Sequence, residues 1–311
     1  MFRAVPAGRR HRRTTWHHRG VPELPEVRAA AGWLTANLGG HEVAKVSIGS
    51  LSFVKTFEPS PDSLVGRTID SVTTRGKFLV FNFAEPDPVH AVVHLSLGGW
   101  LKWRANAPTT PLKLNKQPVA IRMHAEPEGA LEIFEAGHEK RAAMWIVRDL
   151  NEIERVQKLG PDVDHSSVTL EIFVERLAGL GASPLKSALR NQHALAGIGN
   201  AWSDEILHRA KLSPFTRANK MTALQQEALF DAVRHVLAGA TERLAPLPLD
   251  EMKDSKRGGL VIHNHAGDEC PVCGSTIASI AGSGSSSFQY CPGCQTGGRV
   301  LADRRLSRLL T

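Results

Sequence analysis

The spacing of apolar residues divides the chain into a first helix, a series of short strands and a helical second half. Residues 25–38 carry apolar side chains at helical spacing, and Gly39-Gly40 ends this segment. The apolar face of the helix consists of Val27, Ala31, Leu34 and Leu38. From 42 to 148 the apolar runs become short and turn residues separate them, which is typical of a β-sandwich. We expect strands at 43–48, 67–74, 77–83, 89–96, 117–123, 130–135 and 143–148.

From about residue 150 the apolar pattern has the period of helices. We expect helices at 168–180, 185–192, 200–210 and 222–240. Thr222 and Gln225 open the last of these in capping-box spacing. Residues 253–268 are rich in glycine and charge, and we interpret them as a flexible connector. The predicted fold class is α+β, divided into a basic leader (1–21), a β-sandwich domain (22–150), a helical domain (151–250) and a connector with a cysteine-rich hairpin and a basic tail (251–311).

The positive charge of the 311-residue chain is concentrated in its leader. Six of the 38 Lys and Arg residues lie in 1–20, which contains no Asp or Glu. Without them the formal charge of +7 falls to about +1, so a nucleic-acid surface has to come from local clustering. The leader lacks the apolar core of a secretory signal and imitates a mitochondrial transit peptide in composition. We interpret it as a disordered tail or, preferably, as upstream sequence that is not translated. No window has the ~18 apolar residues of a membrane span, so we expect no membrane partner.

All four cysteines belong to two CxxC pairs near the C-terminus, Cys270 with Cys273 and Cys291 with Cys294. Four thiolates at this spacing can close a tetrahedral site, so we predict one structural zinc ion, with a redox-active CxxC as the rival interpretation. No cysteine is left for a disulfide framework, which favours a reducing, cytoplasmic location. A zinc ribbon alone does not distinguish DNA, RNA and protein partners.

The run Pro22-Glu23-Leu24-Pro25-Glu26-Val27 has two interpretations. The first is an ordinary helix start, because proline and acidic residues favour the first turn of a helix. The second is a catalytic N-terminus. As written, Pro22 is internal and its nitrogen is an amide with no usable lone pair, so this second role requires Pro22 to be the first residue of the mature protein.

Further motifs follow the run in a fixed order. Lys77, in Arg75-Gly76-Lys77-Phe78-Leu79, comes 55 residues after Pro22. Leu159-Gly160-Pro161-Asp162 lies near the junction of the two halves, and Gly197-Ile198-Gly199-Asn200 is a glycine-rich turn at the start of a predicted helix, where backbone N–H groups can bind a phosphate. Together with the cysteine hairpin these motifs cover residues 22–297, and they resemble the formamidopyrimidine-DNA glycosylase/endonuclease VIII family of base-excision repair enzymes.

The resemblance implies a β-sandwich joined to a helix-two-turn-helix domain with a zinc finger, and damaged double-stranded DNA bound in the cleft between them. It implies a bifunctional DNA glycosylase and abasic-site lyase in which the Pro22 amine attacks the sugar C1′ and forms an iminium that supports β-elimination. Glu23 moves protons at the sugar, and Lys77 binds the phosphate beside the lesion. The residues implied to contact DNA are Glu26, His94, Leu97, Lys140, Arg141, Lys186 and Asn200. We expect a monomer that acts on DNA in the bacterial cytoplasm.

The chain departs from the family pattern in the loops that fill the gap left by an extruded base. Leu97 stands at the position of a methionine wedge, Lys140 at that of an arginine, and Ala142 at that of an intercalating phenylalanine. Residues 282–287 lack the arginine that normally precedes the third cysteine, and we expect Phe288 to pack within the hairpin together with Tyr290. These changes affect recognition and leave the chemical groups in place, so we predict lyase capacity with an altered base preference.

Two functional hypotheses of different classes remain open at this point. In the first, Val21 reflects a GTG initiator codon, and removal of the initiator methionine exposes Pro22 in an active enzyme. In the second, Pro22 stays blocked and the chain is a non-catalytic damaged-DNA or abasic-site binding protein, whose leader adds salt-dependent affinity. A third interpretation, a zinc-ribbon transcription or RNA factor, is disfavoured by the motifs around Lys77 and Asn200.

Overall fold

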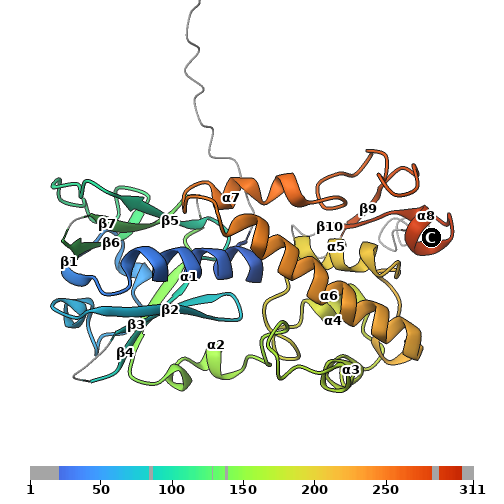
Figure 1. Cartoon of the computed structure of the whole chain (residues 1–311), viewed down its shortest axis with the longest axis horizontal. Coiled ribbons are helices and arrows are strands. Elements are labelled where there is room, and N and C mark those ends of the chain that lie inside the picture. The colour runs from blue at the N-terminus through green and yellow to red at the C-terminus, as the bar shows by residue number, and fades with distance from the viewer. Residues whose placement is uncertain (1–20, 84–86, 128, 137–138, 282–286, 303–311) are drawn as a thin grey trace, which may run out of the picture.

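Two four-stranded antiparallel sheets form the first half of the molecule (Figure 1). The computed structural model describes residues 21–83, 87–127, 129–136, 139–281 and 287–302. One sheet has the strand order β1-β6-β7-β5 and the other β2-β3-β4-β8. The strands are β1 Glu42–Ile48, β2 Ile69–Arg75, β3 Phe78–Phe83, β4 Val89–His94, β5 Gly99–Arg104, β6 Val119–Glu126, β7 Ala130–Glu135 and β8 Ala143–Val147.

Helix α1 (Leu24–Leu38) runs along the middle of the molecule and packs on the sandwich and on the helical half (Figure 1). The carboxylate of Glu26 accepts a hydrogen bond from the backbone N–H of Glu23 at 2.7 Å and so satisfies one donor of the first turn. The apolar face expected from the sequence is buried, because Val27, Ala31, Leu34 and Leu38 all lie in the core.

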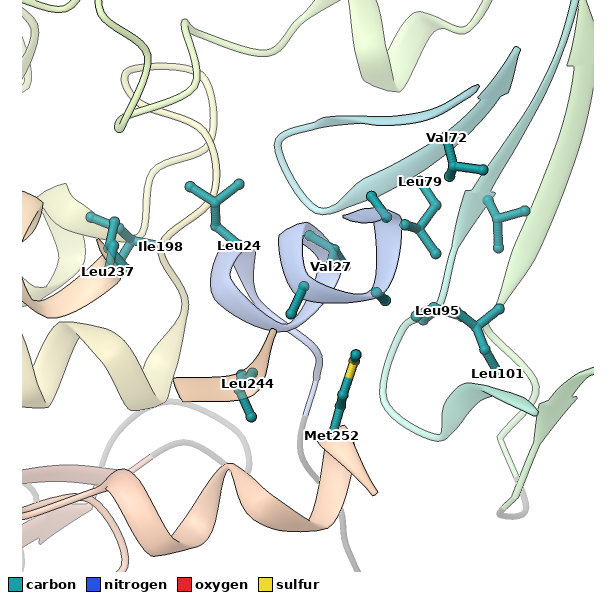
Figure 2. Close-up of a cluster of buried hydrophobic side chains, with 14 of the residues drawn as sticks. Leu24, Val27, Val72, Leu79, Leu95, Leu101, Ile198, Leu237, Leu244 and Met252 are labelled. Carbon is teal, nitrogen blue, oxygen red and sulfur yellow. The ribbon is translucent and has the colours of Figure 1, made fainter. Parts of the chain in front are cut away.

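The largest hydrophobic cluster extends through both halves of the chain. Figure 2 shows Leu24 and Val27 of α1 between side chains of the sandwich and side chains of the helical half. The sandwich contributes Val72, Leu79, Leu95 and Leu101, and the helical half contributes Ile198, Leu237, Leu244 and Met252. The two halves therefore share one core, which fixes their relative position.

The second half is helical and ends in a two-stranded hairpin. Helix α6 begins with the predicted capping box, in which Thr222 N–H donates to the Gln225 side chain at 3.0 Å and Gln225 N–H donates to the Thr222 hydroxyl at 3.3 Å. In the part of the chain that the structure describes, no helix is both long and apolar enough to span a membrane. The helices are α2 Glu154–Gln157, α3 Leu170–Ala178, α4 Leu185–Leu189, α5 Asn200–Arg209, α6 Ala223–Leu244, α7 Met252–Ser255 and α8 Pro292–Thr296, and the hairpin strands are β9 Ala278–Ala281 and β10 Ser287–Tyr290.

Two segments differ from the sequence prediction. Strand β5 was not expected because Gly98-Gly99 has the composition of a turn, yet the strand pairs with β7 and buries Trp100 and Leu101. The predicted flexible connector 253–268 begins within α7 and packs against the rest of the protein along much of its length. Apolar contacts made by Leu260 and Ile262, which interrupt its polar composition, explain this difference.

Asp162 joins the two halves at the predicted junction. Its carboxylate accepts hydrogen bonds from the guanidinium of Arg75 at 2.6 Å and from the backbone N–H of Gly76 at 2.8 Å. Arg75 also donates to the carbonyl oxygens of Leu159 and Gly160. Since Gly76 directly precedes Lys77, this network fixes the β2–β3 turn that carries the lysine.

We predict that D162A destabilises the protein by about 2–4 kcal/mol, because it leaves a partly buried arginine and a buried N–H without their partner. Urea unfolding followed by circular dichroism measures the change. The control is E154A, which breaks the fully exposed Glu154–Lys158 pair and should leave the unfolding midpoint unchanged. Equal midpoints for D162A and the wild type would contradict a structural role for Asp162.

Candidate active site and metal cluster

The carboxylate of Glu23 lies at the N-terminus of helix α5. It accepts hydrogen bonds from the backbone N–H groups of Gly199 at 2.5 Å, Ala201 at 2.9 Å and Trp202 at 3.3 Å. The first N–H groups of a helix have no partner within the helix and carry a partial positive charge, so this position favours an anion. A residue next to α1 of the sandwich thus caps a helix of the second half.

Glycine is required at two positions for this approach. A Cβ atom at Gly199 would lie 2.3 Å from the carboxyl carbon of Glu23, and one at Gly197 would lie 2.8 Å from the side chain of Leu24. Gly197 also has a φ of +116°, a conformation that other residues rarely adopt. The carbonyl oxygen of Gly197 accepts a hydrogen bond from Leu24 N–H at 3.1 Å, so the glycine-rich turn packs directly against the start of α1.

This geometry changes the interpretation of the glycine-rich turn. From the sequence we expected its N–H groups to face a DNA phosphate, but those of Gly199, Ala201 and Trp202 are occupied by Glu23. The side chain of Asn200 is half-buried, and its Oδ1 is buried with no hydrogen-bond partner among the described residues. Gly199 is therefore explained by the carboxylate of Glu23, and Gly197 by the approach of Leu24.

Glu26 and Lys256 complete a buried charged group beside Glu23. Besides the Glu23 N–H, Glu26 accepts hydrogen bonds from the indole N–H of Trp202 at 3.0 Å and from the Lys256 ammonium at 3.1 Å. The Lys256 ammonium also lies 3.5 Å from the Glu23 carboxylate and 5.4 Å from the centre of the Trp202 ring. The negative charge of two adjacent carboxylates is thus partly neutralised by Lys256, a residue that no sequence motif indicated.

The charges around the two carboxylates shift their pKa values in opposite directions. Burial acts to raise the pKa of Glu23, but the positive charges of Lys256 and Lys77 and the α5 backbone N–H groups outweigh it and lower the pKa. Burial raises the pKa of Glu26, and the negative charge of Glu23 adds to this effect. Glu23 is therefore the more acidic member of the pair.

Lys77 lies in the β2–β3 turn and is half-buried. Burial lowers the pKa of its ammonium to about 8, although the negative charge of Glu23 acts in the opposite direction. A lysine with this pKa is only partly charged just above neutral pH. The structure thus brings Glu23, Glu26 and Lys77 together as expected.

Pro22 immediately precedes this group. It is buried at the entry to α1, and Glu23 follows it directly. With residues 1–21 attached its nitrogen is a tertiary amide, so a nucleophilic role depends on the N-terminus being at Pro22.

The residues of the sandwich loops that we expected to contact DNA lie at the ends of strands, on the same side of the sandwich. His94 ends β4, packs on Phe78 with ring centroids 4.7 Å apart, and has a buried Nδ1 without a partner among the described residues. Burial lowers the pKa of His94 to about 4, so its ring is neutral. Leu97 is half-buried, and the Gly98 carbonyl oxygen next to it accepts a hydrogen bond from Ala136 N–H at 3.2 Å.

The loop between β7 and β8 is held by Glu135, the last residue of β7. The Glu135 carboxylate accepts the backbone N–H groups of Arg141 at 2.6 Å and Ala142 at 2.8 Å. Lys140 is exposed and donates to the Glu135 carbonyl oxygen, while the exposed Arg141 pairs with Glu139 at 2.8 Å. Ala142 is buried, in agreement with its inability to intercalate, whereas His138, next to this loop, lies outside the described residues.

Lys186 differs from expectation, because it is fully buried. Its ammonium lies 2.5 Å from a carboxylate oxygen of Asp204, donates to the Ser287 carbonyl oxygen at 2.9 Å and sits 4.8 Å from the centre of the Phe288 ring. Its charge is used to join α4, α5 and the hairpin, and a DNA contact by Lys186 stays a prediction. Phe288 packs on Phe215 outside the hairpin, with ring centroids 5.9 Å apart, which differs from the expected packing within the hairpin, whereas Tyr290 is fully buried.

The four cysteines come together as the spacing predicted. The Sγ atoms of Cys270 and Cys294 are 3.9 Å apart, and those of Cys273 and Cys291 are 3.3 Å apart. A tetrahedral zinc ion with bonds of about 2.3 Å to sulfur places its sulfurs roughly 3.8 Å apart, so these residues fit the metal. His208 of α5 also approaches the cysteines: its Nε2 lies 3.4 Å from the Cys270 Sγ, and with Cys270, Cys291 and Cys294 it forms a group whose potential ligand atoms all lie within 4.8 Å of one another, a group that does not include Cys273.

The thiols are crowded in a way that a metal ion would relieve. Hydrogen bonds from Ser275 lower the pKa of Cys273 to about 6, which favours the thiolate that binds metals. Burial raises the pKa of Cys291 and of Cys294, and hydrogen bonds with neighbouring thiols of the cluster add to this effect. Residues 282–286, which make up most of the segment without the family's arginine, lie outside the described residues.

Comparisons with known proteins agree with this architecture. The model of the formamidopyrimidine-DNA glycosylase N-terminal domain matches residues 21–136, and the model of the formamidopyrimidine-DNA glycosylase H2TH domain matches residues 159–245. A formamidopyrimidine-DNA glycosylase of Symbiobacterium thermophilum is 30% identical over 286 residues, which cover 88% of this chain and 89% of that protein. An uncharacterized formamidopyrimidine-DNA glycosylase-like protein of Mycobacterium tuberculosis is 46% identical over 155 residues, which cover 49% of this chain and 94% of that protein.

The same fold is found in solved structures. The complex between Lactococcus lactis Fpg and DNA containing an abasic site superposes with a TM-score of 0.76 at 23% identity, covering 88% of this chain and 99% of that chain. The complex of the same enzyme with DNA containing an oxidized pyrimidine has a TM-score of 0.77 at 23% identity. Two family models match most of the chain, and a relative is 30% identical over nearly its whole length. This chain therefore belongs to the formamidopyrimidine-DNA glycosylase family of DNA-repair glycosylases.

Proposed function

We propose that the protein is a bifunctional DNA glycosylase and abasic-site lyase whose nucleophile is the amine of Pro22, freed as the first residue of the mature chain. The observation that carries the proposal is the Glu23 carboxylate, fixed by three backbone N–H groups of α5 directly beside Pro22. A carboxylate held this firmly, with Lys77 nearby, suits proton transfer at a sugar bound in front of it.

The chemistry follows from a secondary amine at this place. The Pro22 nitrogen bonds to the sugar C1′ while the bond from C1′ to the damaged base breaks, and the departing base takes a proton from water. The Glu23 carboxylate then accepts the proton of the new ammonium and passes it to O4′ as the C1′–O4′ bond opens, which produces a cationic iminium. Loss of a C2′ proton and of the C3′–O bond expels the 3′ strand, and water hydrolyses the iminium to release Pro22.

The proposed partner is double-stranded DNA with a damaged base. Solved complexes of the Lactococcus lactis enzyme contain DNA with an abasic site or DNA with an oxidized pyrimidine, and we extend this class of ligand to the present chain. Lys77 and Asn200 would bind phosphates beside the lesion, and Leu97 would enter the space of the extruded nucleotide. Lys140 offers only a point charge to the opposite base, and Ala142 offers no wedge, so a narrowed or altered base preference is part of the proposal.

We further propose one structural zinc ion held by Cys270, Cys273, Cys291 and Cys294. In this arrangement the metal would stabilise the hairpin, with no open position for catalysis. The His208 Nε2–H would donate to the Cys270 sulfur and so join the metal site to α5.

The nucleophile is tested by borohydride trapping on a duplex with an abasic site. A protein that begins at Pro22 should give a covalent adduct, whereas the chain that begins at Met1, with an amide at Pro22, should give none. E23Q, which is nearly isosteric, should slow formation of the adduct by about 10²-fold or more because an amide cannot accept the proton from the Pro22 nitrogen and pass it to O4′. E42Q alters an exposed glutamate of β1 and should form the adduct at the wild-type rate. Adduct formation by both starting points would contradict the role of Pro22.

The Lys77 pKa predicts a pH dependence of DNA binding. Since the pKa is lowered to about 8, the charge is present below this pH and is lost as the pH rises through it. Affinity for a duplex with a reduced abasic site should therefore weaken between pH 7 and pH 9, by up to about tenfold per unit once the group titrates. K77R stays charged throughout and should bind with little pH dependence. Fluorescence anisotropy measures both proteins, and parallel pH curves would exclude Lys77 as the titrating phosphate contact.

The metal site is tested by metal analysis and cobalt substitution. The wild type should bind about one zinc ion per chain, and C291S should lose the ion and unfold at a lower temperature. Cobalt-loaded H208F should keep the absorption spectrum of a four-thiolate site, because His208 is proposed as a hydrogen-bond donor and not as a ligand. A spectrum in H208F with a changed number of thiolate ligands, or zinc retained by C291S, would contradict the assignment.

A further inference from the structure

Lys256 belongs to the segment that the sequence predicted to be a flexible connector, yet its side chain reaches the centre of the candidate active site. The Lys256 side chain is only 12% exposed, and its ammonium lies 3.1 Å from Glu26 and 3.5 Å from Glu23. The aromatic face of Trp202 covers it at 5.4 Å. No motif of the sequence assigns a function to this lysine.

The connector is anchored on both sides of Lys256. Before it, the indole N–H of Trp100 donates to the Leu249 carbonyl oxygen at 2.8 Å, and Met252 is buried in the core (Figure 2). After it, the backbone N–H groups of Val261, Ile262 and His263 donate to the Glu205 carboxylate at 2.8 to 3.0 Å. The position of the ammonium is therefore fixed by the sandwich on one side and by α5 on the other.

Glu26 depends more than Glu23 on the positive charge of Lys256. Glu23 has the α5 N–H groups and the positive charges of Lys77 and Lys186 near it, while Arg190 adds positive charge around both lysines. Among the described residues, the hydrogen-bond donors of Glu26 besides Lys256 are neutral, namely the Glu23 N–H and the Trp202 indole, and Lys77 acts on Glu26 through its charge without a hydrogen bond. Two buried carboxylates this close repel each other, so one of them would take up a proton without a cation between them.

We propose that Lys256 is a positioning residue of the active site, which holds the side chains of Glu23 and Glu26 as an ionised pair at the N-terminus of α5. It acts through Glu23 and needs no contact with the sugar. Its catalytic consequence rests on the proposed lyase function, whereas its effect on the carboxylates does not. The neighbouring carboxylates also raise the pKa of Lys256 against the opposing effect of burial, so it remains charged and is unsuited to be a nucleophile.

The test compares K256Q, which keeps a hydrogen-bond donor without the charge, with K256R, which keeps the charge. Carboxyl-¹³C glutamate signals, assigned with E23Q and E26Q, report the titration of the pair in the DNA-free protein. K256Q should raise the apparent pKa values of the pair by roughly 1–3 units, as expected for the loss of an opposite charge within hydrogen-bond distance, and K256R should restore them. The matched control is K253M in the same segment, whose wild-type ammonium faces the carbonyl oxygens of Gly98 and Gly99 at 3.5 and 3.4 Å and not the carboxylates.

Kinetics add a second readout on the protein that begins at Pro22. K256Q should slow borohydride-trapped adduct formation at neutral pH by about tenfold or more while binding a reduced abasic duplex as tightly as the wild type, and K256R should recover most of the rate. Unchanged titration of the pair in K256Q, or an equal shift in K253M, would overturn the proposal. If the wild type forms no adduct, the proposed function fails, but the titration still decides the role of Lys256. If K256Q does not fold, K256M/E26Q, which removes both charges of the contact, allows the titration of Glu23 to be followed.

Discussion

The arrangement of this protein depends on one buried carboxylate that belongs to one half of the molecule and is bound by the other. Glu23 precedes α1, which packs in the sandwich, and its oxygens are held by the first N–H groups of α5. An isolated carboxylate in such a place would cost several kcal/mol in lost hydration, and it is the N–H groups together with Lys256 that offset this cost. Because the same contact brings α1 and α5 together, the position of Pro22 relative to the helical half is set by it.

The remaining features of the site follow from this contact. Gly199 has to lack a side chain so that the carboxylate can reach the helix, and Gly197 has to adopt a positive φ so that the turn can meet Leu24. Asp162 holds the turn of Lys77 to the helical half, so the lysine faces the same carboxylate. The site therefore lies at the interface of the two halves, which explains why its residues are far apart in the sequence.

Much of the fold could be predicted because its signals are local. The helical period of 25–38 and the capping box at Thr222 are properties of short segments, and the spacing of the two CxxC pairs alone predicts that their thiols come together. Strand β5 escaped prediction because its glycines favour a turn, and only pairing with β7 compensates for their weak strand preference.

The missed parts of the site depend on contacts between distant segments. Lys256 lies in a sequence of polar and glycine residues that is typical of a mobile loop, and its importance arises from two glutamates more than 200 residues away. His208 lies in α5 with nothing nearby to indicate a cysteine partner, and the charge of Lys186 is used internally although its position predicted a DNA contact. In each case the sequence shows a charged or ligating side chain but does not show which distant residue it contacts.

The central claim is that the amine of Pro22 forms the bond to the sugar, and its most direct test is the site of attachment in the borohydride-reduced adduct. Other amines lie near the same group, among them Lys77 with a pKa of about 8 and Lys256 with a raised pKa. Peptide mass mapping of the adduct formed by the protein that begins at Pro22 should locate the reduced sugar on the N-terminal peptide, at the proline nitrogen. Attachment to Lys77 or Lys256, or the absence of any attachment, would contradict the account.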